Sequence, residues 1–154
     1  MNKPRAVIFD IDGCLTKKRD RKLKGGLMTL AEYEKGYPYD VPQEWSRYLA
    51  NVLDSHGVDI IMCTARSPRH RGATIKWLSD HGIPCDELYM RDVDDTRTAD
   101  KIKKDIYLNK ISKKYNILMA LDDHKSVCDM FRSLGVAALD CDGAVEVPIK
   151  DLKQ

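Results

Sequence analysis

Two aspartates near the start of the sequence, Asp10 and Asp12, follow an apolar run and are followed directly by Gly13. Residues two apart on an extended chain point to the same side, so these carboxylates would lie together beyond the end of a strand. Two like charges this close repel unless a cation lies between them or one carboxylate takes up a proton, and either outcome is useful in catalysis. The alternative is a strand that ends in an Asx turn, which the Asp-Gly pair also favours.

Two further apolar runs end in polar clusters. Residues 58–63 lead into Thr64 and Arg66, and residues 117–121 lead into Asp122 and Asp123. In open α/β sheets the ligand crevice lies at the carboxyl ends of the strands, so we expect all three clusters to converge in space. For Asp122 and Asp123 the alternative is a helix N-cap followed by an acidic first turn, and one residue can cap while the other binds metal.

Strand and helix patterns alternate along the whole chain. Strands are predicted at residues 6–9, 58–63, within 83–90, at 117–121 and at 136–139, and helices at residues 27–37, 42–56, 72–80, 98–115 and 125–134. This alternation predicts an α/β fold, a three-layer α/β sandwich with a mostly parallel, Rossmann-like sheet of about five strands and a small cap or none. We expect one domain over residues 1–154, with a basic loop or insertion around residues 17–40.

The composition excludes several classes of protein. A chain with 43% apolar and 32% charged residues is an ordinary soluble globule rather than a disordered or membrane protein. No apolar run is long enough to span a bilayer and no signal peptide is present, so we expect a cytoplasmic protein without a membrane partner. The five cysteines are scattered and form no Cys-x-x-Cys pair, which favours reduced, mostly buried thiols.

The residue types narrow the chemistry further. The four histidines show no spacing typical of zinc ligands, whereas a cluster of aspartate oxygens suits Mg²⁺. No Gly-x-x-x-x-Gly-Lys-Ser/Thr loop is present, which excludes a kinase of that class. Asp140 and Asp142 repeat the Asp-x-Asp-Gly pattern, but few residues follow to supply partners, so we interpret them as part of a polar loop.

Taken in order, Asp10-Ile11-Asp12-Gly13, Thr64, a downstream lysine and Asp122-Asp123 resemble the motifs of the haloacid dehalogenase superfamily of phosphatases. A finer resemblance is to the 3′-phosphatase domain of phage-type polynucleotide kinase/phosphatase. The segments that carry it include residues 63–66, 95–97, 100–111 and 121–127. The kinase half of such bifunctional enzymes has no counterpart in this sequence, which leaves room for a separate kinase or ligase partner.

The resemblance implies a two-step phosphoryl transfer. Asp10 would attack phosphorus and form an aspartyl-phosphate, and Asp12 would protonate the leaving oxygen and later deprotonate the hydrolytic water. It also implies Mg²⁺ as the cofactor, bound by the Asp10 carboxylate, the Asp12 carbonyl and Asp122 or Asp123.

The same resemblance implies a set of phosphate ligands. Thr64 and a lysine would bind the equatorial oxygens, with Arg66 as an additional clamp. Lys101, Lys103 and Lys104 crowd one turn, and the helix pattern favours Lys103, with Asp100 one turn earlier as its orienting partner. The candidate substrate-binding residues are therefore Arg66, Arg21, Asp100 and Arg97.

Two positions depart from the family pattern. Cys14 stands where the family usually has threonine, a side chain that is not expected to do chemistry. The family's basic residue shortly after the first motif has no clean counterpart, because residues 21–37 resemble an insertion. This insertion would cover the site, where the substrate is selected.

The leading hypothesis is a Mg²⁺-dependent phosphatase acting on 3′-phosphate ends of nucleic acid or on nucleotides. Residues 17–24 contain six cations and one anion, and with several arginines they could follow a phosphate backbone, although such a run also serves solubility alone. The alternatives are a small-molecule nucleotide or sugar phosphatase and a catalytically silent nucleic-acid-binding module. The complete set of catalytic residue types argues against the silent module.

Overall fold

Five parallel strands form the central sheet, and their carboxyl ends carry the polar clusters of the sequence. The strands are β1 (Arg5–Phe9), β2 (Asp59–Thr64), β3 (Glu87–Met90), β4 (Asn116–Asp122) and β5 (Ala138–Asp140), in the order β3-β2-β1-β4-β5. This computed structural model describes residues 2–17 and 29–142. Most of the predicted basic run, including Arg21, lies outside the described residues.

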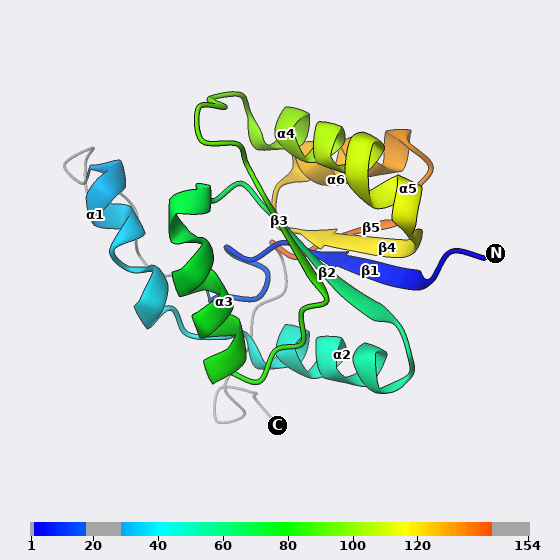
Figure 1. The fold of residues 1–154 in the computed structure, drawn as a ribbon, viewed down its shortest axis with the longest axis horizontal. Coiled ribbons are helices and arrows are strands. Elements are labelled where there is room, and N and C mark those ends of the chain that lie inside the picture. The colour runs from blue at the N-terminus through cyan, green and yellow to red at the C-terminus, as the bar shows by residue number, and fades with distance from the viewer. Residues whose placement is uncertain (1, 18–28, 143–154) are drawn as a thin grey trace, which may run out of the picture.

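Helices cover both faces of the sheet (Figure 1). One face carries α2 (Glu44–Ser55) and α3 (Arg71–Asp80), and the other carries α4 (Ala99–Ile106), α5 (Ser112–Lys114) and α6 (Lys125–Ser133). Strand β1 serves both layers, because Val7 and Phe9 pack with the α2 and α3 side chains while Ala6 and Ile8 pack with α4 and α6. The predicted three-layer sandwich is therefore confirmed, and residues 6–9 of β1 are buried.

The described part of the predicted insertion forms only short elements. They are α1 (Leu30–Glu34) and the 3₁₀ turn η2 (Tyr37–Tyr39), before α2 begins. Helix α1 starts with a capping box, in which the Thr29 hydroxyl accepts from the Glu32 N–H and the Glu32 carboxylate accepts from the Thr29 N–H. These elements add few buried side chains to the fold, because α1 buries none and η2 buries only Tyr37.

Several boundaries differ from the expectations. Helix α2 begins at Glu44 rather than at Pro42, because Pro42 forms an antiparallel bridge with Thr16. The helix expected over residues 98–115 changes after α4 into a π-helical turn, η4 (Tyr107–Ile111), and then into α5. Asp140 is the last residue of β5 rather than part of a loop.

The cysteines agree with the expectation from composition. All five cysteines are free thiols, and all except Cys85 are buried. Among residues 2–17 and 29–142, no helix combines the length and apolar character needed to cross a membrane.

The polar clusters after β1 and β4 lie at the topological switch point of the sheet, where the strand order reverses. From β1 the chain moves outward to β2 and β3, then returns across to β4 and β5, so β1 and β4 are neighbours with their helices on opposite faces. Such a switch point opens a crevice at the carboxyl ends of the two strands. The Asp10 N–H donates to the Leu121 carbonyl at 2.9 Å, which joins the two strand ends there.

Candidate active site

The loop after β1 is a tight turn around one carbonyl. The Ile11 oxygen accepts hydrogen bonds from the N–H groups of Leu15 and Thr16, both at 3.0 Å. Gly13 has φ of 83°, a left-handed conformation that costs a glycine little, and its N–H donates to the Thr16 hydroxyl at 3.1 Å. The turn fixes the backbone on both sides of Asp12 and leaves Asp10 at the end of its strand.

Lys103 lies between two carboxylates from different strands. Its ammonium donates to Asp10 Oδ1 at 2.7 Å and to Asp122 Oδ2 at 2.5 Å, and its side chain is only 2% exposed. Helix α4 buries Ile102 and Ile106 in the core and thereby holds Lys103 over the strand ends. Of the three candidate lysines, Lys103 is thus the one that the fold brings to Asp10, while Lys101 and Lys104 are exposed.

Negative charge exceeds positive charge in this cluster. Burial raises the pKa of Asp10 well above its usual value, and the neighbouring carboxylates add to that effect while Lys103 opposes it. Burial would also raise the pKa of Asp122, but the Lys103 charge and the hydrogen bonds from His124 and Lys103 lower it overall. Burial disfavours the Lys103 cation, but Asp10 and Asp122 outweigh burial and raise its pKa. A further cation would therefore offset the remaining negative charge of the cluster.

Four side chains could bind that cation. Asp10, Asp122, Asp123 and His124 each place one ligand atom so that all four atoms lie within 4.8 Å of one another. Three carboxylates form a donor set that suits a hard cation such as Mg²⁺, so the residues present fit the metal. The structure thus brings Asp10, Asp122 and Asp123 together, as we expected from the sequence. That they bind a metal, together with the Asp12 carbonyl, stays a prediction.

His124 was not predicted as a member of the site. Its Nδ1 lies 3.0 Å from Asp123 Oδ1, its N–H donates to Asp122 Oδ1 at 2.9 Å, and its side chain is 63% exposed. Hydrogen bonds to Asp122 and Asp123 raise the pKa of His124 to about 10. The histidine spacing along the sequence gave no signal for His124, whereas its position two residues beyond the strand-ending Asp122 could have given one.

Asp12 has different surroundings from Asp10. Arg66 binds it with two parallel hydrogen bonds, Nε to Oδ2 at 2.9 Å and Nη2 to Oδ1 at 2.7 Å. Thr64, at the end of β2, is buried, and its hydroxyl accepts from the Arg66 N–H at 3.2 Å. The convergence of the β1 and β2 clusters that the sequence predicts is therefore present.

Arg66 itself is buried, and four of its hydrogen bonds go to protein groups, namely Asp12 twice, Asp40 and Thr74. A guanidinium group has five N–H donors, so most of its capacity is used inside the protein. The structure thus places Arg66 first as the residue that holds Asp12. Its function as a phosphate clamp stays a prediction.

The other predicted substrate-binding residues have local partners. Asp100, in the first turn of α4, has its pKa lowered mainly by a hydrogen bond with the Thr98 side chain. The carboxylates that hold Lys103 are Asp10 and Asp122 rather than Asp100. Arg97 pairs with Asp95 and with Asp105, each at 2.7 Å. Arg21 lies outside the described residues.

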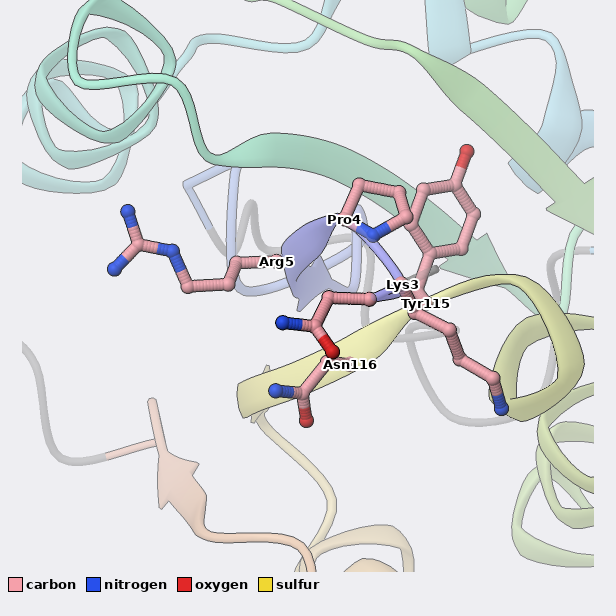
Figure 2. Close-up of a pocket in the computed structure, with 6 residues that line it drawn as sticks. Lys3, Pro4, Arg5, Tyr115 and Asn116 are labelled. Atoms are coloured by element: carbon pink, nitrogen blue, oxygen red, sulfur yellow. The ribbon is translucent and has the colours of Figure 1, made fainter.

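A separate hollow lies at the amino ends of β1 and β4, at the other end of the sheet from the carboxylates. Figure 2 shows Lys3, Pro4, Arg5, Tyr115 and Asn116 around it. Arg5 and Asn116 are the first residues of β1 and β4, whereas Asp10 and Asp122 lie at the other ends of these strands. This hollow is therefore remote from the carboxylates and is not the candidate active site.

Comparisons with known proteins agree with this geometry. A putative bifunctional polynucleotide kinase/RNA ligase of Autographa californica nuclear polyhedrosis virus is 28% identical over 144 residues, which are 86% of this chain and 18% of the viral protein. A solved structure of the Pnkp1/Rnl/Hen1 complex contains a chain that is 27% identical, with a TM-score of 0.74 over 90% of this chain and 46% of the other.

A more distant relative has the same fold. The class C acid phosphatase of Bacillus anthracis is 18% identical and superimposes with a TM-score of 0.67, over 88% of this chain and 61% of the enzyme. The chain thus spans about a fifth of the viral relative and less than half of the Pnkp1/Rnl/Hen1 chain. The sequence model described as the polynucleotide kinase PNKP phosphatase domain matches residues 4–144, and the chain belongs to this family of haloacid-dehalogenase-type phosphatase domains.

Proposed function

We propose that this protein is a Mg²⁺-dependent phosphatase that removes 3′-phosphate groups from nucleic acid ends through an aspartyl-phosphate on Asp10. The observation that carries the proposal is the separation of the two aspartates into different environments. Asp10 lies with Lys103 and Asp122, and Asp12 lies on the guanidinium of Arg66. A nucleophile and a proton carrier need such different surroundings.

The proposed reaction has two steps. In the first, an Asp10 oxygen bonds to phosphorus, the bond to the 3′ oxygen breaks, and Asp12, which carries a proton before this step, gives that proton to the leaving oxygen. In the second, Asp12 takes a proton from water as the water attacks phosphorus, and the bond from Asp10 to phosphorus breaks to release inorganic phosphate. Bound Mg²⁺ would offset the negative charge of the phosphate and of the carboxylates around it.

Lys103 and Thr64 have supporting functions in this proposal. Lys103 keeps a positive charge against Asp10, which lowers the repulsion between the carboxylate and an approaching phosphate. Thr64 ends β2 beside Arg66, and its hydroxyl hydrogen can be donated to a phosphate oxygen while its oxygen accepts from the Arg66 N–H.

The preference for nucleic acid rests on the family and on an open site. The description of the matching family names the phosphatase domain of a polynucleotide kinase. The viral relative is named as a putative bifunctional polynucleotide kinase/RNA ligase. Within the described part of the insertion only α1 and η2 could cover the site, and both are short. The relatives' kinase and ligase names also support a kinase or ligase that acts beside this domain.

Release of phosphate from a 3′-phosphorylated oligonucleotide tests the proposal. We expect turnover that requires Mg²⁺, stops with EDTA and is lost in Asp10→Asn. The same oligonucleotide with a 5′-phosphate and a 3′-mononucleotide serve as substrate controls. Undiminished turnover in Asp10→Asn would exclude the mechanism, and faster turnover of the mononucleotide would favour a small-molecule phosphatase instead.

A further inference from the structure

The segment between η2 and α2 carries a buried carboxylate that the proposed reaction does not use. The Asp40 side chain is 0% exposed, and its Oδ2 lies 3.2 Å from Arg66 Nη2. Burying an aspartate is costly unless it is paired and hydrogen-bonded. The position of Asp40 against the same guanidinium that holds Asp12 therefore needs an explanation.

Asp40 is fixed in place by its backbone. Its carbonyl accepts from the Trp77 indole N–H of α3 at 2.8 Å. The next residue, Val41, accepts from the Lys17 N–H at 2.7 Å, beside the bridge between Thr16 and Pro42. These contacts join Asp40 to α3 on one side and to the catalytic loop on the other.

Several neighbours hold the Arg66 guanidinium on its edges and on one face. Asp12 and Asp40 share its Nη2, and the Thr74 hydroxyl accepts from Nη1 at 3.2 Å. The Tyr37 ring lies over the guanidinium, with the Arg66 Cζ 3.8 Å from the ring centre. Because these contacts fix the edges and one face of the planar guanidinium, its N–H groups point toward Asp12 in a single orientation.

We propose that Asp40 is a positioning residue, which fixes Arg66 and through it the orientation of the Asp12 carboxylate at the reaction centre. This inference rests on the proposed function, because it assigns to Asp12 the movement of the proton. In this proposal Asp40 acts through Arg66 and not directly on the phosphate or on the nucleophile. The segment between η2 and α2 (residues 40–43) thereby supports catalysis although it carries no catalytic group.

The proposal predicts a specific kinetic signature. A nucleoside 3′ oxygen needs a proton to leave, whereas p-nitrophenolate leaves from p-nitrophenyl phosphate without one. Both substrates give the same aspartyl-phosphate, whose hydrolysis needs Asp12 as a base. A misplaced Asp12 therefore slows both steps for the oligonucleotide but only the second step for p-nitrophenyl phosphate.

The test compares Asp40→Asn with the wild-type protein on both substrates in the presence of Mg²⁺. For the 3′-phosphorylated oligonucleotide we expect kcat to fall about 10- to 100-fold with little change in KM. For p-nitrophenyl phosphate we expect a burst of about one equivalent of p-nitrophenol, followed by a slow steady state, because the aspartyl-phosphate accumulates.

Two further variants make the result decisive. Asp86→Asn is the matched control, because Asp86 is an aspartate that accepts from the Ile60 N–H at 2.6 Å near the amino end of β2 and should give no burst. If Asp40→Asn does not fold, Trp77→Phe removes the hydrogen bond to the Asp40 carbonyl and should give a weaker effect in the same direction.

The outcomes separate this inference from the proposed function. An active wild-type protein with unchanged kinetics in the variants overturns the positioning function alone. A rise in KM at constant kcat also overturns it, because Asp40 would then serve substrate binding. A wild-type protein that hydrolyses neither substrate overturns the proposed function and this inference together.

Discussion

The Lys103 ammonium lies 2.7 Å from the carboxylate of Asp10, although 93 positions separate the two residues in the sequence. The contact joins α4 to the end of β1, and the second contact of Lys103 reaches Asp122 at the end of β4. A buried cation between two carboxylates offsets part of their repulsion without neutralising the whole cluster. The cluster therefore keeps a net negative charge, which a bound cation would offset.

Replacement of Lys103 by methionine should lower both stability and activity. Without metal, the change leaves Asp10 and Asp122 buried without their cation, which should cost about 3 to 5 kcal/mol of unfolding free energy. Urea unfolding in EDTA measures this loss. With Mg²⁺ the difference from the wild-type protein should shrink, because the metal supplies a counter-charge.

The matched control is Lys104→Met on the same helix. Lys104 is exposed, so its replacement should change the unfolding free energy by less than about 0.5 kcal/mol. Equal effects of the two replacements would show that the buried contacts of Lys103 contribute little to stability.

Metal binding should raise the thermal stability of the protein. At a Mg²⁺ concentration about 100 times the Kd, binding contributes about 2.7 kcal/mol. For a chain of this length that corresponds to a Tm increase of roughly 5 to 10 °C. The increase should fall sharply in Asp122→Asn and Asp123→Asn, and the larger loss identifies the direct ligand. Asp129→Asn in α6, whose carboxylate pairs with Lys125 at the surface, should keep the full increase.

Much of the site follows from patterns that are local in the sequence. A continuous apolar run such as residues 7–9 is typical of a strand covered on both faces, and polar residues after such strands lie at the carboxyl ends of the sheet. The choice of Lys103 came from matching the helix to the family rather than from hydrophobicity. Burial of a lysine there departs from the ordinary rule that lysine side chains are exposed, which makes Lys103 a candidate functional residue.

Other features depend on distant contacts that leave no local signal. Asp40 lies 26 positions from Arg66, in a segment without a recognisable motif, and its burial results from the packing of η2 against α3. The expectation of Arg66 as a phosphate clamp followed from a resemblance, whereas its bond to Asp12 depends on how β2 lies beside β1. The pairing of Arg66 with Asp12 and Asp40 therefore depends on the tertiary fold and cannot be predicted from local sequence patterns.

The network at Glu87 should make stability depend on pH. Hydrogen bonds from Tyr89, Lys114 and Tyr115 lower the pKa of Glu87 despite its partial burial. A lowered carboxyl pKa adds stability above the unfolded value of about 4.3, and this contribution is lost as pH falls through the folded value. Glu87→Gln should therefore cost about 1 to 2 kcal/mol at pH 7, and its unfolding free energy should approach that of the wild-type protein below about pH 4.

Asp80→Asn is the control for that pH series. Asp80 pairs with Lys76 on the exposed face of α3, so the variant should match the wild-type protein closely at both pH values. A Glu87→Gln defect that stays constant between pH 7 and pH 3 would mean that packing, rather than the charge of Glu87, carries the effect.

Contact with a nucleic acid backbone should appear in the salt dependence of catalysis. Arg69 is exposed in the 3₁₀ turn η3 (Pro68–His70), three residues after Arg66 at the carboxyl end of β2. If it contacts one phosphate of a single strand, Arg69→Gln should reduce the slope of log(kcat/KM) against log salt by about 0.7 for the oligonucleotide. For a 3′-mononucleotide, which lacks the neighbouring phosphate, the slope should not change. Lys113→Gln in α5, an equal change of charge near the amino edge of the sheet, should leave both slopes unchanged. If the two variants behave alike, the effect comes from net charge and Arg69 is not a backbone contact.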